Sequence, residues 1–458
     1  MRLATFLVAI GMLLMSFSSV FSEAAVMAWQ QSGGTIGPER FNLQAVSAPG
    51  QTGAAGYTAK EANKLIESWK GEAAYSIKGT FPVKAGSRQK EVETAGIGGN
   101  YSDFTSILLD RGSMITEASN ERMDQVVVIS DSLADYLFGS TDVLGKEIMI
   151  QNQKLRIIGV YSTENNLMDW MSRGVKPEVL LPSSVFAELS PESRVGTILL
   201  EASGDALLNG EMQVNKALLE NKLTPGVYKI EIGEKGWRLM KQLPRLLPAL
   251  TGVIILVLGL IWMRRIAGGT YGRMKRALKI GDSDEVMKRE RLYMFRQILV
   301  FIAIGASTVA LVLLARFSFF IPSEYIPDRW IDLNFFKTKL FEHWQEQPPL
   351  FSHILPYQLL EDRLGSYIPV VTAVGLLLGL PLFLLGIREW KRNALPLAKR
   401  FVRLFYCIAF CYLLLGLVML LIGLPQFISP GLWISLFGFC LFFAAYQQPN
   451  REDDYVKH

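Results

Sequence analysis

The apolar positions of this chain gather in long runs, and one polar region separates the first run from the others. A helix that spans a membrane needs about 20 apolar residues. Runs of this kind cover residues 3–22, 246–263, 298–315, 367–387, 404–424 and 428–446, although Pro430 and Gly431 interrupt the last one. The pattern predicts a membrane protein with an α-helical bundle of about six spans. It places a large domain, residues 23–245, between the first two spans.

The first run allows two interpretations. A single basic residue, Arg2, precedes it, and Val20 and Ser22 suit cleavage by a signal peptidase after Ser22. The apolar stretch is long for a signal peptide, so we favour a retained anchor. Under both interpretations the polar region that follows is exported.

The charges between the runs orient the spans. Residues 264–296 contain ten Lys or Arg and four Asp or Glu, and residues 388–403 contain six basic residues and one acidic residue. Residues 316–365, by contrast, contain five basic and seven acidic residues. Because Lys and Arg concentrate on the cytoplasmic side of a membrane, we place the first two loops inside and the third loop outside.

These boundaries give a complete domain plan. It consists of an anchor or signal peptide (1–22), an exported domain (23–245), spans two and three (246–315) with a cytoplasmic loop (264–297), an outer loop (316–366), a fourth span (367–387), a basic cytoplasmic loop (388–403), two further spans (404–446) and a cytoplasmic tail (447–458).

Strand and helix patterns alternate in the exported region. We expect strands at residues 125–130, 146–150, 154–161, 196–202 and 226–232, and helices at 57–69, 131–138 and 207–221. Ser130 or Asp131 is placed to cap the second of these helices. The stretch up to about residue 56 is rich in Gly, Ser, Ala and Gln and reads as a loose lead-in. The pattern predicts an α+β domain with its own core.

Composition supports a membrane protein and excludes several kinds of site. Half of the residues are hydrophobic and 19% are charged, whereas a soluble domain has about 25% charged residues. A net charge of +5 over 458 residues gives no reason to expect nucleic acid as a partner. The cysteines Cys407, Cys411 and Cys440 all lie in apolar runs, so the exported region has neither a disulfide framework nor a cysteine zinc site.

Catalytic chemistry is not expected in this chain. The histidines are His343, His353 and His458, so the exported region lacks the base of a Ser-His-Asp hydrolase. The nearest match to a phosphate-binding loop, residues 139–147, has one residue too many between its glycines and Glu147 where Ser or Thr is required. We therefore expect no catalytic, cofactor or metal site and no ATP hydrolysis by this chain.

The middle of the exported region resembles a known family. Residues 126–161 read VVVISDSLADYLFGSTDVLGKEIMIQNQKLRIIGVY, and residues 100–114 and 180–185 read NYSDFTSILLDRGSM and LLPSSV. In order and spacing, these segments are similar to the exported core domain of MacB/FtsX-type ABC transporter permeases. The resemblance covers about half of the exported region.

The first cytoplasmic loop carries a second resemblance. Residues 271–280, YGRMKRALKI, are similar to the short coupling helix that docks these permeases into a groove on a cytoplasmic ATPase. An apolar stripe with basic flanks can fill such a groove and meet acidic partners, although it would also suit a helix lying on anionic lipid. The residues expected at the ATPase are Arg273, Met274, Lys275, Arg276, Ala277, Leu278 and Lys279.

The resemblance implies a permease subunit in the plasma (inner) membrane of a bacterium, paired with a second copy or with a related permease. A separate cytoplasmic ATPase would move the exported domain and so export or extract a peptide, lipid-like or antibiotic substrate. The alternative is an FtsX-like scaffold that binds and activates extracytoplasmic cell-wall hydrolases without transport. An extracytoplasmic adaptor is a further partner that the resemblance admits.

The chain also departs from the family pattern. The outer loop is long, and two spans follow the point where such permeases end. Gly375 and Gly379 in the fourth span form a GxxxG pattern, which permits close packing of helices.

Overall fold

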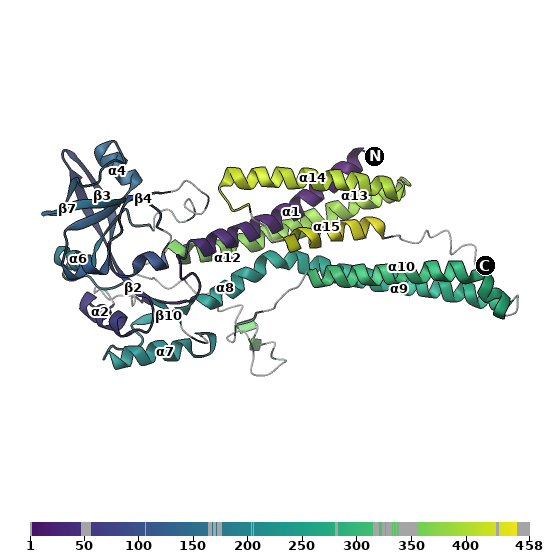
Figure 1. Cartoon of the computed structure of the whole chain (residues 1–458), viewed down its shortest axis with the longest axis horizontal. Helices are drawn as coiled ribbons and strands as arrows, with labels where there is room; N and C mark the ends of the chain where they lie inside the picture. Colours follow the sequence, from purple (N-terminus) through teal and green to yellow (C-terminus); the bar gives the residue numbers. More distant parts are fainter. Residues whose placement is uncertain are drawn as a thin grey trace. The chain divides into compact units, whose positions relative to one another are not determined.

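The computed structural model describes residues 2–46, 56–105, 107–163, 176–202, 206–279, 283–314, 356–426 and 430–446, with a few residues between these ranges. The chain forms two compact units (Figure 1). The helical unit consists of Met1–Ala24, Lys241–Phe319 and Ser366–His458, and the sheet unit consists of Ala25–Met240 and Phe320–Gly365.

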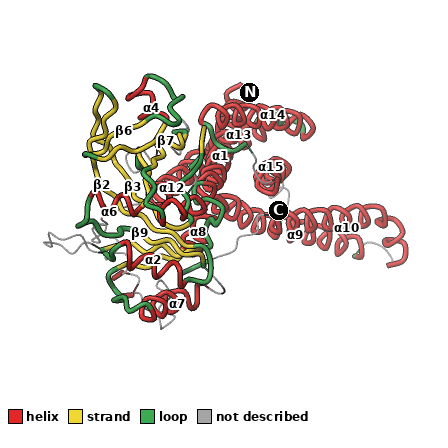
Figure 2. The backbone as a smooth tube through the Cα atoms, turned by 60° about the vertical axis from the view of Figure 1, so that its left-hand side comes forward, coloured by secondary structure: helices red, strands yellow, loops and turns green. Residues whose placement is uncertain are grey.

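A mixed ten-stranded sheet forms the centre of the sheet unit (Figure 2). Its strands are β1 (Arg40–Ala45), β2 (Ala73–Ala85), β3 (Arg88–Gly99), β4 (Leu109–Gly112), β5 (Val126–Ser130), β6 (Glu147–Ile150), β7 (Gln153–Tyr161), β8 (Val179–Pro182), β9 (Thr197–Glu201) and β10 (Tyr228–Ile232). Their order is β10-β1-β9-β2-β3-β8-β5-β7-β4, and β6 pairs with β2 and β7. The helices of this unit are α2 (Ala59–Ser68), η1 (Tyr101–Phe104), α3 (Glu117–Glu121), α4 (Asp131–Phe138), α6 (Ser183–Leu189), α7 (Ala206–Glu220) and α8 (Gly233–Gln242).

The predicted elements of the exported region are confirmed within a residue or two at each end. In α4, the hydroxyl of Ser130 accepts a hydrogen bond from the Leu133 amide at 3.1 Å, which makes Ser130 the N-cap. The helix ends at Gly139, whose φ of 72° places it in the left-handed region that glycine tolerates. β6 and β7 then form the expected antiparallel hairpin. The α+β fold class is correct.

The loose lead-in predicted up to residue 56 is wrong for most of the residues that the structure describes there. Helix α1 (Arg2–Gln31) continues past the first span, and β1 lies fully buried between β9 and β10. Its sequence, RFNLQA, alternates polar and apolar residues as a strand does. The Gly, Ser, Ala and Gln residues on either side of this short strand led to the prediction of a loose segment. Residues 47–55 lie outside the described part of the chain.

Each face of the sheet carries its own apolar core. The larger core includes Phe41, Tyr75 and Phe186, together with the buried sides of α2, α4 and α7. The smaller core on the other face includes Tyr101 and Phe104. The sheet is therefore covered on both faces, so the polar side chains of β1 need partners inside the fold.

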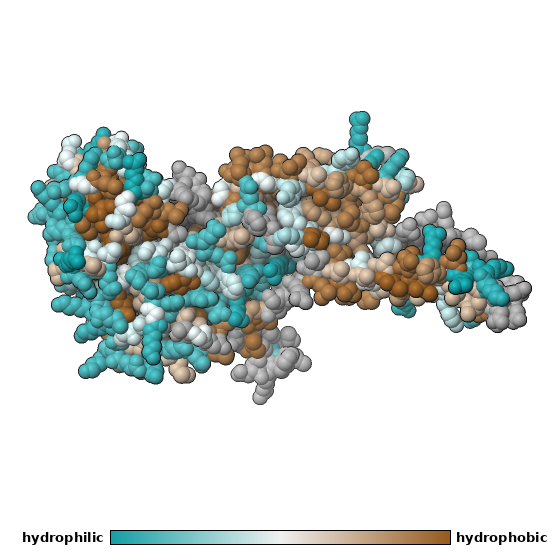
Figure 3. Space-filling view, viewed as in Figure 1, coloured by the Kyte–Doolittle hydropathy of each residue, from teal (hydrophilic) through white to brown (hydrophobic). Residues whose placement is uncertain are grey.

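The helical unit contains the predicted spans. Its helices are α1, η2 (Leu243–Arg245), α9 (Leu246–Leu278), α10 (Ser283–Leu314), α12 (Pro356–Val374), the π-helical turn η4 (Gly375–Gly379), α13 (Leu380–Arg392), α14 (Leu397–Ile422) and α15 (Pro430–Ala445). Among the described residues, five helical segments are long and apolar enough to cross a membrane, and α15 is a shorter apolar helix of 16 residues. Apolar side chains cover much of the visible surface of these helices (Figure 3).

A glycine seam brings α1 against the fourth span. The seam consists of Gly11 on α1 and of Gly375, Gly379 and Gly386 on η4 and α13. A methyl group added at Gly11 would lie 2.4 Å from the backbone nitrogen of Phe383, and one added at Gly386 would lie 2.8 Å from the carbonyl oxygen of Ala4. The GxxxG pattern therefore lies in a close helix contact, as the sequence suggested.

The last helix is part of the same bundle. α15 packs against α9, α10 and α14. The Lys391 ammonium group on α13 donates hydrogen bonds to the carbonyl oxygens of Phe443 (3.1 Å) and Tyr446 (2.6 Å) at the end of α15. A cation at the C-terminus of a helix satisfies carbonyl groups that have no partner within the helix. Lys391 thereby fixes α15 to the fourth span.

Candidate functional site: a helix–sheet junction and a cytoplasmic hairpin

Arg40 is the centre of a buried junction in the sheet unit. It stands at the start of β1 and is fully buried. Its Nη1 donates hydrogen bonds to the carbonyl oxygens of Gly33 (3.1 Å) and Phe104 (2.8 Å). Burial lowers the pKa of this guanidinium from its ordinary value, yet arginine remains charged in proteins. The junction must therefore stabilise a cation away from water.

Two aromatic rings complete the surroundings of Arg40. The guanidinium carbon lies 3.9 Å from the centre of the Tyr357 ring, close enough for a cation–π interaction. Trp29 stacks on the same tyrosine with ring centres 4.6 Å apart, and its indole nitrogen donates to the Tyr357 carbonyl oxygen at 3.1 Å. Trp29 belongs to the end of α1, and Tyr357 belongs to the start of α12.

A second contact joins α12 to the sheet. The side chain of Gln358 is buried, and its amide oxygen accepts a hydrogen bond from Gln44 on β1. Its amide nitrogen donates to a carboxylate oxygen of Glu231 on β10 at 2.9 Å. The start of α12 is therefore bonded to two neighbouring strands.

The junction joins the end of α1 and the start of α12 within the sheet unit. Its side chains all belong to the sheet unit, but α1 and α12 continue along the chain into two of the predicted spans. Separating a buried charge or amide from its partner costs free energy. The bonds at Arg40 and Gln358 therefore oppose sliding of α12 against the sheet. The start of α12 is thus bonded to β1 and β10, and Trp29 at the end of α1 is bonded to the start of α12.

The predicted coupling residues lie at the end of a long helix. α9 runs without interruption from Leu246 to Leu278, so residues 271–278 continue the second span and do not form the separate short helix that the resemblance implied. The physical reason is that no proline follows Pro248 in this segment, while Gly268, Gly269 and Gly272 retain helical geometry. The turn at residues 280–282 lies outside the described residues.

Arg273 joins α9 to α10 in this hairpin. Its Nη2 lies 2.9 Å from a carboxylate oxygen of Glu290, which is buried. The guanidinium carbon also lies 4.0 Å from the centre of the Tyr293 ring. Arg273 therefore has partners within the hairpin, and its role at an ATPase stays a prediction.

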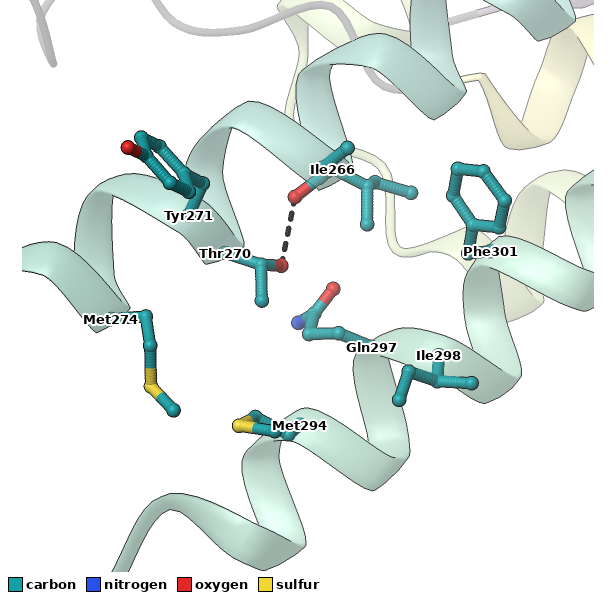
Figure 4. A pocket seen from close by; sticks show the side chains of 9 residues that line it. Ile266, Thr270, Tyr271, Met274, Met294, Gln297, Ile298 and Phe301 are labelled. Atoms are coloured by element: carbon teal, nitrogen blue, oxygen red, sulfur yellow. Dashed lines mark hydrogen bonds between the residues drawn. The ribbon is translucent and has the colours of Figure 1, made fainter. Parts of the chain in front are cut away.

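A cavity of about 400 Å³ opens between the two helices of the hairpin (Figure 4). Its lining is apolar except for Thr270, Tyr271 and Gln297. The thioethers of Met274 and Met294 point toward one another across it (Figure 4). Of the predicted stripe, Met274 thus faces the partner helix, whereas the side chain of Leu278 is exposed. Lys275, Arg276 and Lys279 are also exposed.

Comparison with known families decides the nature of the first part of the chain. Residues 3–210 match the family model of the MacB-like periplasmic core domain. The chain carries a MacB-like periplasmic core domain. The resemblance to MacB/FtsX-type ABC transporter permeases is confirmed, and the chain is a multi-pass inner-membrane protein with an extracytoplasmic domain early in its sequence.

Curated relatives are similar over part of their length. The macrolide export ATP-binding/permease protein MacB of Aggregatibacter actinomycetemcomitans is 26% identical over 178 residues, which are 38% of this chain and 26% of that protein. The pyoverdine export ATP-binding/permease protein PvdT of Pseudomonas aeruginosa is 32% identical over 97 residues, which are 20% of this chain and 15% of that protein. The chain thus matches about a quarter of the length of the first relative and less of the second.

Two solved structures are similar to the MacB-like domain. One is the periplasmic region of MacB from Actinobacillus actinomycetemcomitans; the aligned part covers 43% of this chain and 89% of that structure, with 19% identity and a TM-score of 0.35. The other is the extracellular domain of the noncanonic ABC-type transporter YknZ from Gram-positive bacteria; the aligned part covers 42% of this chain and 99% of that structure, with 19% identity and a TM-score of 0.34.

The match to the MacB-like domain includes Arg40 but ends before the hairpin and before α12. The contact of Trp29 and Arg40 with Tyr357 was not predicted, because more than 300 residues separate the partners and neither segment carries a local signal for the other. Among the described residues, no group of three or more His, Cys, Asp or Glu side chains could hold a metal ion. His343, His353 and His458 lie outside the described residues.

Proposed function

We propose that this chain is the permease subunit of a MacB/FtsX-type ABC transporter that transmits motion rather than forming a water-filled path. A separate cytoplasmic ATPase hydrolyses ATP and moves the spans. The spans then move the MacB-like domain, which exports or extracts a peptide, lipid-like or antibiotic substrate. The described spans offer few ionisable side chains for a polar path across the bilayer.

The junction at Arg40 is the observation that carries this proposal. It bonds the end of α1 to the start of α12 through Trp29 and Tyr357, and it bonds α12 to the neighbouring strands β1 and β10 through Gln358. A sheet held in this way follows the movement of its supporting helices. Such a connection suits force transmission, and a domain that only waited for a soluble partner would not need it.

The cytoplasmic end of α9 is the proposed contact with the ATPase. Its last turns expose Lys275, Arg276 and Lys279 around the apolar side chain of Leu278. A basic rim around an apolar centre can meet an acidic groove on a soluble protein. Arg273 and Met274 support this surface from within the hairpin, because their partners are on α10.

Purification of the full chain in mild detergent tests the proposal. We expect an ATPase of the ABC type to accompany the chain, and we expect the triple variant Arg273→Glu, Lys275→Glu, Arg276→Glu to lose it. Because Arg273 also stabilises the hairpin, the double variant Lys275→Glu, Arg276→Glu separates docking from folding. The matched control reverses three charges in the other cytoplasmic loop, at Arg388, Arg392 and Lys399.

The outcomes discriminate clearly. Loss of the ATPase in the double variant and its retention in the control support the proposed contact. Unchanged ATPase association and activity in the triple variant would refute it. If the chain instead purifies with an exported cell-wall hydrolase and no ATPase, the FtsX-like scaffold replaces the transporter as the function.

A further inference from the structure

Helix α7 of the sheet unit has an apolar face that no described element covers. Leu208, Met212 and Leu219 are 79%, 71% and 63% exposed, respectively. Figures 1 and 2 both show α7 at the edge of the domain, outside α2 and the sheet. Monomeric proteins seldom leave several large apolar side chains exposed together, so this face calls for a partner.

The direction of this face is fixed by packing on the other side of the helix. Ala206, Val214 and Leu218 are buried in the core of the domain. A methyl group added at Gly210 would lie 2.6 Å from the Phe41 ring, so α7 lies close against β1. The exposed side chains cannot turn inward without breaking this contact.

The exposed positions follow the spacing of a coiled-coil seam. Leu208, Met212, Asn215 and Leu219 are separated by four, three and four residues, which is the alternation of core positions in two paired helices. Asn215 is half-buried within the seam, and its amide can both donate to and accept from a second copy of itself. A seam with one polar position selects a defined register.

The charges beside the seam are complementary to those of a second, parallel copy of α7. Glu211 and Lys216 lie on opposite flanks of the seam, five residues apart. In a parallel pair of identical helices, a residue on one flank faces the residue five positions further along on the opposite flank of the partner. Glu211 of one copy would therefore face Lys216 of the other, and the same pair would occur twice by symmetry. Lys216 also lies 3.9 Å from Glu220 in its own helix, at the surface.

We propose that α7 forms a parallel helix pair with α7 of a second copy of this chain, along Leu208, Met212, Asn215 and Leu219. The inference deepens the proposed function and rests on it only in supposing two permeases side by side, because no ATPase is needed for the contact. Two chains confined to one membrane meet at a high effective concentration, which favours pairing along a seam of two heptads. The contact would join two MacB-like domains on the outer side of the membrane.

Cysteine cross-linking of the full chain in its membrane tests the pairing. Met212→Cys should give a covalent dimer with a short bismaleimide that does not enter the membrane, and Leu219→Cys should do the same. The matched control is Gln213→Cys on the same helix, which lies off the seam and should give no dimer. The unmodified chain is a second control, because its cysteines Cys407, Cys411 and Cys440 are buried in the helical unit.

Charge exchange tests the direction of the pair. Glu211→Lys or Lys216→Glu in the Met212→Cys chain should lower the yield of dimer several-fold, because each change places like charges opposite one another. The two changes together restore opposite charges and should restore the yield.

Three results would overturn the inference. The first is a yield at Met212→Cys that equals the Gln213→Cys control. The second is cross-linking of Leu208→Cys to Leu219→Cys without any dimer of Leu208→Cys alone, which indicates an antiparallel contact. The third is cross-linking of the seam to a different protein, which assigns α7 to an adaptor. Copurification of the ATPase, measured on the same variants, reports on the proposed transporter function separately.

Discussion

The glycine seam between α1 and the fourth span predicts a large effect of a single methyl group. In the variant Gly11→Ala, the new Cβ would lie 2.4 Å from the backbone nitrogen of Phe383 and 2.7 Å from the carbonyl oxygen of Gly379. Ordinary contacts of this kind begin near 3.4 Å, so α1 and α13 must separate by about 1 Å. Backbone atoms cause the clash, so no change of side-chain rotamer relieves it.

The cost follows from the loss of packing along the whole contact. Overpacking of a tight interface costs about 1–3 kcal/mol, whereas Gly→Ala in an open helical position gains about 0.5–1 kcal/mol through helix propensity. Gly416 on α14 provides this reference, since nothing lies within 4 Å of a Cβ added there. Because both glycines lie within helices, the gain in helix propensity is common to the two variants. We therefore expect Gly11→Ala to be less stable than Gly416→Ala by about 1–3 kcal/mol.

Thermal unfolding of the two variants in the same detergent measures this difference. The midpoint of Gly11→Ala should fall by several degrees below that of the unmodified chain, while that of Gly416→Ala should stay the same or rise. Because membrane proteins often unfold irreversibly, both variants must be heated at one scan rate. If Gly11→Ala unfolds at or above the midpoint of Gly416→Ala, the close contact between α1 and α13 does not exist.

Two further predictions concern the sheet unit. Arg40→Met should lower the free energy of unfolding by about 2–3 kcal/mol, because it leaves two buried carbonyl oxygens without donors. Arg40→Lys should recover only part of this loss, since an ammonium group lacks the planar fork of a guanidinium. Equal thermal midpoints for the unmodified chain and the two variants would contradict the role of the junction. Burial raises the pKa of Tyr101 to about 12 from its ordinary value of 10. Between these pH values the unfolded chain loses this proton while the folded chain keeps it, so stability falls as pH rises. In Tyr101→Phe the free energy of unfolding should therefore fall less steeply over this window, and an identical slope would refute the assignment.

Much of the fold was readable from local patterns. The α4 helix with its Ser130 cap, the hairpin of β6 and β7, and the strand–helix–strand end of the domain each follow from residues that are close in sequence. The spans were equally clear, because a membrane requires long apolar helices. These features depend on the spacing of apolar residues and on helix capping, and both can be read from a single sequence.

The contacts between distant parts of the chain could not be predicted from such local patterns. The position of β1 between two other strands depends on pairing with β9 and β10, which lie more than 150 residues further along the chain. The partner of Arg40 on α12 is further away still. The uninterrupted course of α9 was missed for another reason, since the family resemblance implied a separate short helix at residues 271–280, whereas the second span continues through residue 278 without a break. The residues proposed at the ATPase remain a prediction.

The junction at Arg40 also has a consequence for how the protein is made. Trp29 and Tyr357 are 328 residues apart in sequence. At about 5–20 residues per second, a ribosome needs roughly 15–65 s to synthesise the chain between them. During this interval the exported domain has a buried arginine without its aromatic cover. The domain therefore completes its fold only after the start of α12 has been synthesised and has reached the outer side of the membrane. Folding of the exported domain therefore ends where the fourth span begins, and a chain shortened before that point would expose an incomplete domain to the proteases outside.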